Sequence, residues 1–277
     1  MNWRTIKTIA GKDIKEATQN KSVWLPILIV PLIFVVLLPV GMTLAIGSSA
    51  ATEANPLNDP DFAMFMERMP QFLSDLIEGL DSAQSGIVLL LLGYLFAPFF
   101  LIMPLMFSTV IASESFAGER ERKTVEALLY TPATDTELFL GKVLAALVPA
   151  LLITWGGFLA YSVVVNVAAY SVMGRIWFPL PSWYPLILWV SPAISLLGIA
   201  VTVLISGKVQ TFMGAYQSSG SLVLLVLALL AGQATGVLYL SVPVVLLIGL
   251  VLFLVDAVLM YYAIRTFNRD RLLASSG

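Results

Sequence analysis

The residues of this sequence that could take part in chemistry are few, and many of them lie in one short stretch. The chain contains no cysteine and no histidine, which excludes a thiolate nucleophile, a cysteine-ligated metal and an imidazole base. Six of the eight residues in 119–126 are charged, in a chain in which only 12% of all residues are. Alternating acids and bases of this kind suit electrostatic docking between proteins better than bond-making chemistry.

The charged stretch is expected to form a short amphipathic helix. Val125, Leu128 and Leu129 fall on one side of a helical wheel, and opposite charges recur four residues apart on another. Each such pair stabilises a helix by only about 0.2–0.5 kcal/mol. Pro132 ends the helix, and a capping box at 134–137 begins the next one. An apolar edge flanked by charges suits docking into a protein groove, although a solvated connector helix without a partner fits the residues equally well.

The elements that position this stretch are predicted to be membrane-spanning helices. Apolar residues make up 59% of the 277-residue chain, whereas a soluble domain usually carries about 25% charged residues. A helix needs roughly 20 residues to cross a bilayer. The charge-poor runs therefore predict a single all-α integral membrane domain with six spans, at 23–46, 86–110, 141–167, 185–205, 221–240 and 243–264.

Lysine and arginine are distributed unevenly around these spans. Thirteen of the fifteen fall in the N-terminal segment, in the loops after the second and fourth spans, or in the C-terminal tail, and only Arg68 and Arg175 fall on the other side. The positive-inside rule places the cation-rich side in the cytoplasm. The sequence thus predicts that both termini and the loop 111–140 are cytoplasmic. The net charge of −2 argues against a nucleic-acid partner.

Two segments outside the spans are also expected to be helical. Residues 1–22 resemble an amphipathic helix that lies on membrane lipid, although a plain basic anchor is the simpler alternative. The extracellular loop 47–85 carries seven acids and one base; a two-helix cap is favoured there over a cation-collecting surface. The apolar arc of the first segment consists of Trp3, Ile6, Ala10, Ile14 and Ala17.

Three polar residues inside the spans are candidates for a transport pathway. Asp256 is the one carboxylate in the long run 209–264, and a carboxylate near mid-membrane costs about 2.5–3.5 kcal/mol on insertion scales. A protonated or internally paired aspartate is the alternative. Gln233 and Thr235 lie in the sequence Gly-Gln-Ala-Thr-Gly, a small-xxx-small pattern that also serves plain helix packing or a loosened helix end.

The stretch 113–144, SESFAGERERKTVEALLYTPATDTELFLGKVL, resembles the permease subunits of ABC-2 type exporters. Lys123 departs from the pattern, since the family often has glycine there. The six spans, the surface helix and the outer loop extend the likeness over the whole chain. The matching residues are Glu119, Arg120, Glu121, Thr124, Glu126, Leu128, Leu129, Thr131, Pro132, Leu140, Gly141 and Lys142.

The resemblance implies a non-enzymatic permease subunit of an ATP-driven exporter in the plasma membrane. It implies two copies of a separate ATPase, which would bind ATP and Mg, and a second permease chain, identical or similar. This chain is expected to bind no cofactor or metal; its Gly-Lys pairs at Gly11, Gly141 and Gly207 lack the first glycine of a phosphate-binding loop. The implied coupling helix comprises Glu119, Arg120, Glu121, Arg122, Thr124, Glu126, Leu128, Leu129, Thr131 and Pro132.

Other functional classes fit less well. A self-contained secondary transporter or channel, the main alternative, usually shows inverted repeats or several intramembrane ionisable groups, and it gives no reason for the charged loop. An intramembrane hydrolase needs a nucleophile–base pair or a metal site. In the resembling family the second and fifth spans border the pathway, which favours Gln233 over Asp256 as a substrate contact. Neither the cargo nor the identity of the second permease chain follows from the sequence.

Overall fold

The fold comes from a computed structural model that describes residues 2–47, 74, 75, 77, 80, 82–122, 133–209 and 211–266. Within these ranges the chain is helical and contains no strand. Six helices are long and apolar enough to cross a membrane, by length and composition. The prediction of an all-α integral membrane protein with six spans is confirmed.

Several spans are interrupted by π-helical segments, labelled η. Span one follows the N-terminal helix α1 (Trp3–Gln19) and comprises α2 (Lys21–Pro31), η1 (Leu32–Leu37) and α3 (Leu38–Gly47). Span two comprises α7 (Ala83–Val88), η3 (Leu89–Leu95), α8 (Phe96–Phe100), α9 (Ile102–Ser113), η4 (Glu114–Gly118) and α10 (Glu119–Glu121). Span three is α12 (Asp135–Ala168), followed by α13 (Tyr170–Met173); span four comprises α14 (Trp183–Pro185), η5 (Leu186–Val190) and α15 (Ser191–Ser206). Span five comprises α16 (Phe212–Gly220) and α17 (Val223–Ala234), and span six is α18 (Val242–Thr266).

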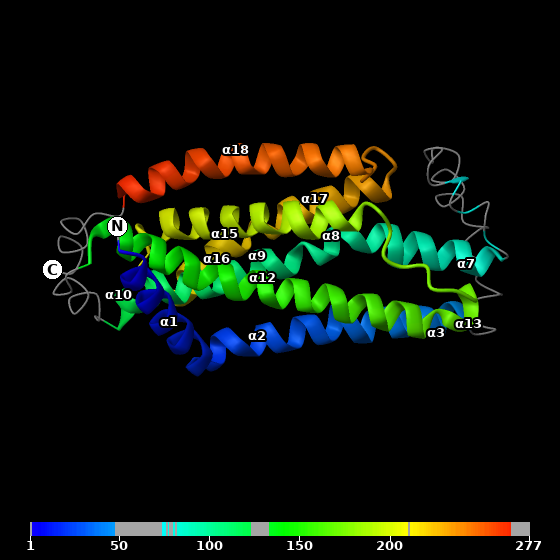
Figure 1. The fold of residues 1–277 in the computed structure, drawn as a ribbon, viewed down its shortest axis with the longest axis horizontal. Helices are drawn as coiled ribbons and strands as arrows, with labels where there is room; N and C mark the ends of the chain where they lie inside the picture. The colour runs from blue at the N-terminus through cyan, green and yellow to red at the C-terminus, as the bar shows by residue number, and fades with distance from the viewer. Residues whose placement is uncertain are drawn as a thin grey trace.

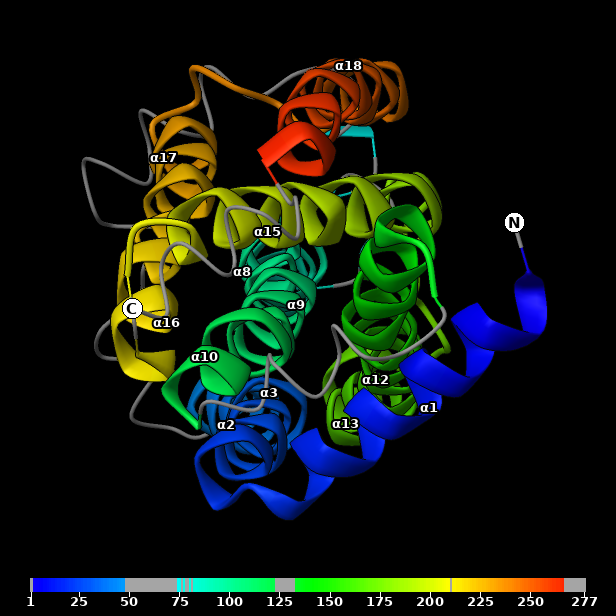
Figure 2. The same ribbon diagram turned by 90° about the vertical axis from the view of Figure 1, so that its left-hand side faces the viewer.

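Spans two and four form the centre of the bundle. Their apolar windows are 78% and 72% buried, against 17–28% for the other four spans, and the end-on view places α8 and α9 among the remaining helices (Figure 2). At Gly198 of α15, an added Cβ would lie 2.8 Å from Ser108 Oγ and 2.9 Å from Thr109 Cγ2 of α9. The glycine therefore allows the two central helices to approach closely.

The half of span two that contains the π-helical segment η3 is held by hydrogen bonds from other spans to the backbone of this segment. A π turn shifts the hydrogen-bond register of a helix, so that backbone carbonyls become available to side chains. The carbonyls of three consecutive residues, Leu92, Gly93 and Tyr94, accept hydrogen bonds from three other spans. Their donors are the Tyr161 hydroxyl at 2.7 Å, Trp183 Nε1 at 2.6 Å and Gln233 Nε2 at 2.9 Å, respectively.

An aromatic cluster surrounds these donors. The rings of Tyr161 and Trp183 stack with their centroids 5.3 Å apart, and the Phe178 ring meets Trp183 edge-on at 4.8 Å. Tyr161 and Trp183 are fully buried. Pairs of this geometry add about 0.5–1.5 kcal/mol beyond their area burial, so these rings form a closely packed core beside η3.

Two elements extend differently from the sequence prediction. The helix of span two continues to Glu121, so that residues 111–118, expected in a loop, are helical, and the helix expected from Glu119 onward begins without a break from span two. Span five was expected at 221–240, but its helix begins at Phe212 and ends at Ala234. Gly236 has a left-handed φ of 69°, and the amides of Val237 and Leu238 both donate to the carbonyl of Gly232. This glycine turn ends the helix.

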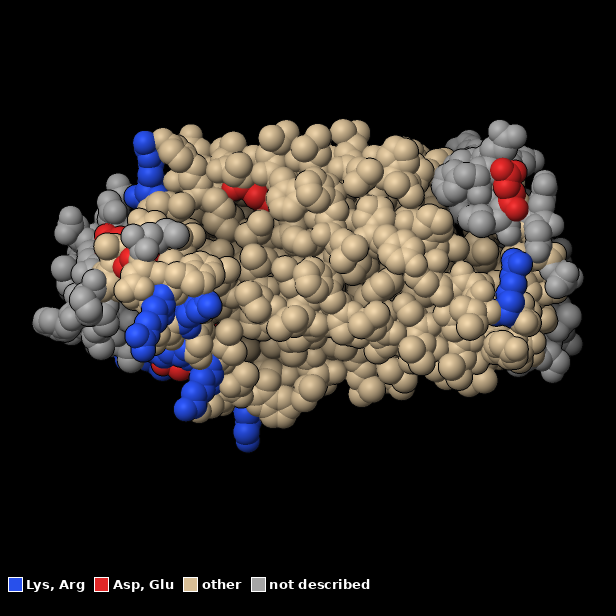
Figure 3. Space-filling model, viewed as in Figure 1, with Lys and Arg blue, Asp and Glu red and all other residues tan. Residues whose placement is uncertain are grey.

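The charged residues divide the bundle into an apolar belt with two polar ends. Lysine and arginine gather at the end that carries α1 and α10, which we term the charged end (Figures 1 and 3). The middle of the visible face consists almost entirely of uncharged residues (Figure 3). This distribution is expected when the belt lies in the hydrocarbon core of a membrane.

Candidate functional site

The expected coupling helix is described only at its beginning. Glu119–Glu121 forms α10, the last turn of span two, and Arg122 follows it. The remaining predicted coupling residues, Thr124, Glu126, Leu128, Leu129, Thr131 and Pro132, lie outside the described residues. The site that the structure shows is therefore the charged end around Glu119–Arg122.

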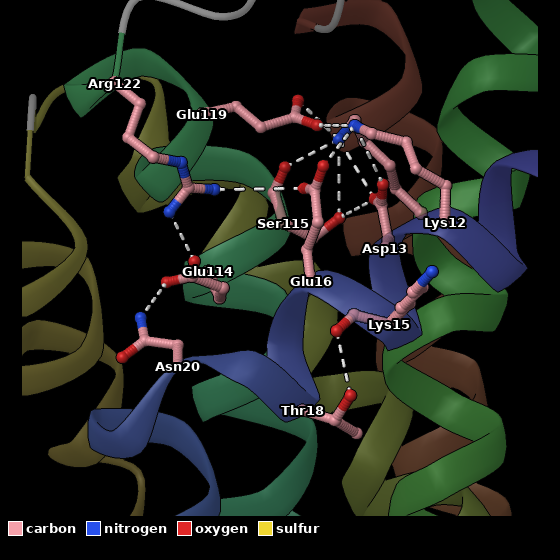
Figure 4. Close-up of polar contacts among 11 residues, drawn as sticks. Lys12, Asp13, Lys15, Glu16, Thr18, Asn20, Glu114, Ser115, Glu119 and Arg122 are labelled. Atoms are coloured by element: carbon pink, nitrogen blue, oxygen red, sulfur yellow. Dashed lines mark hydrogen bonds and ion pairs between the residues drawn. The ribbon is translucent and has the colours of Figure 1, made fainter.

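A π-helical segment turns the acidic residues of span two toward α1. Segment η4 contains Glu114 and Ser115 and leads directly into Glu119. An added Cβ at Gly118 would lie 3.0 Å from Glu114 Oε2, so a larger residue would crowd this carboxylate. All three polar residues are buried, and their side chains point toward α1 (Figure 4).

The ammonium group of Lys142, in the second turn of α12, lies at the centre of the site. It donates to Asp13 Oδ2 at 3.1 Å, to Glu119 Oε2 at 2.6 Å and to the backbone carbonyl of Ser115 at 2.6 Å. The Ser115 hydroxyl also donates to Asp13. Because the side chains of Lys142, Asp13 and Glu119 are at most 3% exposed, the cation and both anions depend on one another for their solvation.

Lys12 completes this group from the solvent side. Its ammonium lies 2.8 Å from Glu119 Oε1, 3.4 Å from Asp13 Oδ1 and 3.4 Å from Glu16 Oε1. Partial burial disfavours the charged form, but the hydrogen bond and ion pair with Glu119, aided by Asp13 and Glu16, outweigh it and raise the pKa of Lys12 above its ordinary value.

The same three carboxylates are close enough together to ligate a metal ion. The Lys12 ammonium already lies within 3.4 Å of an oxygen from each of them. A protein cation thus contacts the same three carboxylates that a metal ion would need, and with it they form an ion-pair network.

A second set of contacts joins η4 to the other end of α1. Arg122 pairs with Glu114, and the side-chain amide of Asn20 donates to Glu114 Oε2 at 3.0 Å. Arg122 also lies 3.9 Å from Glu16. The ion pairs raise the pKa of Arg122 although its partial burial opposes the charge. The end of span two is therefore bonded to α1 at two places.

Helix α1 lies obliquely across the charged end and packs against α12 (Figure 2). An added Cβ at Gly141 would lie 2.9 Å from Ile9 Cβ and 3.2 Å from the Ile6 carbonyl oxygen. Gly141 thus permits the two helices to cross closely, and Lys142 then reaches Asp13. The capping box of α12 is also confirmed: Thr134 Oγ1 accepts from the Glu137 amide, and Glu137 accepts from the amides of Thr134 and Asn2.

The two middle residues of the charged segment contact spans four and five. A guanidinium nitrogen of Arg120 donates to the carbonyl of Ser206, the last residue of α15. Glu121 Oε2 accepts from the amide of Phe212, the first residue of α16, at 2.8 Å. Four consecutive charged residues therefore bond five separate elements of the chain: α12, α1, the end of α15, the start of α16, and η4.

Comparison with known proteins gives the family of the chain. The family model described as ABC-2 family transporter protein matches residues 7–268 of the 277. The chain belongs to the ABC-2 family of transporters. No curated protein sequence matches it. Membership of this family, with six apolar helices, makes the chain a multi-pass membrane permease component, and the matched region includes Asp13, Glu119–Arg122 and Lys142.

The three intramembrane candidates have different surroundings in this ABC-2 chain. Gln233 is buried and donates to the carbonyl of Tyr94, and its Oε1 has no partner among the described residues. Thr235 is exposed and donates to the Ala231 carbonyl. Asp256, in α18, is 3% exposed, and neither carboxylate oxygen has a partner within the part of the chain that the structure describes. The structure does not bring the three together.

The sequence reasoning missed Asp13, Ser115 and Glu114 as site residues, and it treated Lys142 only as part of a family motif. Asp13 carried a usable signal: it lies three residues after Ala10 and four before Ala17, on the apolar arc of α1. A carboxylate on a face that is otherwise apolar needs a buried partner. No comparable signal identifies the partner, because Lys142 lies 129 residues away in the sequence.

Proposed function

We propose that this chain is the permease subunit of an ATP-driven exporter, powered by a separate ATPase. The charged end lies in the cytoplasm with both termini, and the spans lie in the plasma membrane. Two ATPase subunits bind ATP and Mg, and a second permease chain, identical or similar, completes the pathway. Family membership and the strong cation bias of one end support this proposal.

The observation that carries the proposal is the construction of the charged end. Glu119 and Arg122 join the end of span two to α1 and, through Lys142, to α12. Because α12 is a continuous helix of 34 residues with a fixed capping box, a displacement at its charged end is carried across the bundle as a rigid-body shift. A helix of this kind can transmit a displacement that a separate ATPase applies at its charged end.

The proposed cycle uses this displacement to exchange two states of the pathway. ATP binding brings the two ATPase subunits together, and each pulls on the charged segment of one permease chain. The buried network keeps α1, the end of span two and the start of α12 together while they move. Nucleotide then biases a two-state element, as in other switches driven by a bound phosphate. The chain's own residues supply attachment and stiffness and no catalytic group.

The test is to purify the chain with its associated proteins from native membranes and to measure ATP hydrolysis. We expect a P-loop ATPase to accompany the wild-type chain, and Glu126→Arg or Leu128→Asp to reduce its recovery and the hydrolysis rate. Lys208→Ala, at an exposed position of the turn after span four, is the control with unchanged recovery. Transport by the purified chain alone, or unchanged hydrolysis in both variants, would contradict the proposal.

A further inference from the structure

Arg120 and Glu121 contact the ends of two different helices. Arg120 donates to the Ser206 carbonyl, which belongs to the last turn of α15. Glu121 accepts from the Phe212 amide, which opens α16. The last four carbonyls and the first four amides of any helix lack intrahelical partners, so each contact satisfies a group that its own helix leaves open.

The charges of the two residues also match the helix ends that they contact. The C-terminal end of a helix carries a partial negative charge and the N-terminal end a partial positive charge. The cation of Arg120 faces the C-terminal end of α15, and the anion of Glu121 faces the N-terminal end of α16. Thr211 caps α16 separately by accepting from the Gly214 amide, so Glu121 adds to a cap that already exists.

The neighbouring residues of the same segment hold other elements. Glu119 pairs with Lys142 and Lys12, and Arg122 pairs with Glu114. Successive residues of a helix point about 100° apart, which explains how four adjacent side chains reach partners in different directions. All four side chains are thus engaged within the permease itself.

We propose that Arg120 and Glu121 are positioning residues that bond the turn between spans four and five to the end of span two. We call these two contacts the clip. This inference rests on the proposed function, because the clip matters when an ATPase displaces that end. The displacement then reaches spans four and five through Arg120 and Glu121, in addition to span three through Lys142. The two residues act inside the permease, and the ATPase does not need to touch them.

The test compares three variants of the full chain. The reversed pair Arg120→Glu/Glu121→Arg keeps the composition and net charge but opposes both helix ends. The conservative pair Arg120→Lys/Glu121→Gln keeps a donor and an acceptor. Lys208→Ala is the control, because it removes a charge from the same turn. The Lys208 side chain forms no hydrogen bond or ion pair with any described residue.

The first readout is amide hydrogen exchange at Phe212 in the purified chain without any ATPase. The reversed pair is expected to accelerate this exchange roughly three- to tenfold, because the Phe212 amide loses the Glu121 carboxylate as its acceptor. The conservative pair and Lys208→Ala are expected to stay near the wild-type rate. Unchanged exchange in the reversed pair would show that the clip does not exist.

The second readout is ATP hydrolysis by the complex. It distinguishes transmission of the displacement from binding of the ATPase and from folding of the permease. With the reversed pair, we expect the ATPase to be recovered in wild-type amounts, with an unchanged KM for ATP and a kcat about three- to tenfold lower. The conservative pair is expected to restore kcat. Loss of the ATPase from the reversed pair alone would make the two residues partner contacts and overturn the inference, as would faster exchange with an unchanged kcat. Absence of an ATPase from the wild-type chain would overturn the proposed function and the transmission role, whereas the exchange result would still report on the clip.

Discussion

Span two is deformed by π-helical segments at both ends, and the two ends are stabilised in opposite ways. At η3, which we term the neutral end of span two, neutral donors from three other spans bind consecutive carbonyls inside an aromatic core. At η4 and α10, which we term the ionic end, charged side chains bind one another and α1. The same backbone irregularity thus serves a neutral contact at one end and an ionic contact at the other.

The two ends of span two are therefore expected to behave differently. Neutral hydrogen bonds in a packed aromatic core have few alternative partners, so the half of span two that contains η3 is expected to move as a fixed body. The ionic end offers several donors and acceptors within 4 Å of one another, and it ends at the segment that the ATPase is proposed to pull. Force applied there would reach the fixed half through the intervening helix.

The largest effect is expected from removing the buried cation at the ionic end. Lys142→Met leaves Asp13 and Glu119 as neighbouring buried carboxylates, which should cost about 3–5 kcal/mol of stability. Unfolding in detergent by denaturant or heat measures this loss. Lys12→Met, which removes a cation whose side chain is 41% exposed, should cost no more than about 1 kcal/mol. Equal losses would show that burial does not distinguish the two lysines.

A smaller loss is expected where α1 crosses α12. Gly141→Ala forces a methyl group against Ile9, whose Cβ would be only 2.9 Å away, and should destabilise the chain by about 1–3 kcal/mol. The matched control is Gly156→Ala in the same helix, where no atom lies within 4 Å of the added group. That variant should be neutral or slightly stabilising. A similar response from both glycines would contradict the close crossing.

At the neutral end, Tyr161→Phe tests a single hydrogen bond. The variant keeps the ring but removes the donor to the Leu92 carbonyl, and it should cost about 1–2 kcal/mol. Because no charge is involved, the loss should be the same at low and high salt. A strong salt dependence measured by the same unfolding assay would remove the contrast with the ionic end.

The smallest effect concerns the pH and salt dependence of the Lys12 contacts. Folding raises the pKa of Lys12, so its contribution is fully present below the unfolded pKa of about 10.4 and is lost as pH rises through the folded value. The stability difference between wild type and Lys12→Met should stay constant from about pH 7 to about pH 9 and shrink above about pH 10.4. Added salt should reduce it throughout. A difference that grows toward high pH would have the wrong sign.

The sequence predicted those features that depend on local rules. Apolar runs located six spans, and the capping box at Thr134 and Glu137 has the expected bonds. The break after span five follows from local chemistry as well, because Gly236 supplies the left-handed residue that ends the helix, although the sequence prediction placed the end of this span at residue 240. Periodicity placed Trp3, Ile6 and Ala17 on one face of α1 that was expected to lie on membrane lipid; Ile6 and Ala17 are buried within the protein, whereas Trp3 is exposed.

The remaining features depend on contacts between distant parts of the chain. The π-helical segment η3 is stabilised because Tyr161, Trp183 and Gln233 donate hydrogen bonds to its carbonyls, and no local sequence pattern predicts these partners. The charged segment was interpreted as a surface for another protein, yet Arg120 and Glu121 bond the chain's own helices. The wheel of a single helix shows which side chains share a face and not what that face meets.

The pathway assignments of Gln233, Thr235 and Asp256 stay predictions. Gln233 uses its amide nitrogen to hold span two, which gives it a structural role whether or not cargo passes nearby. Asp256 has the stronger claim to an unusual role, since it is buried without a partner among the described residues. An ionised carboxylate in that position would be costly.

The central claim is that an ATPase moves the ionic end as one unit while the neutral end stays fixed. The most direct measurement is amide hydrogen exchange of the purified complex, nucleotide-free and after trapping with ADP and vanadate, with the chain alone as reference. We predict that exchange changes together in α1, in Glu119–Arg122 and at Phe212, and that it stays unchanged around Tyr161 and Trp183. The same change in the chain alone, or no change at the ionic end of the trapped complex, would contradict the account.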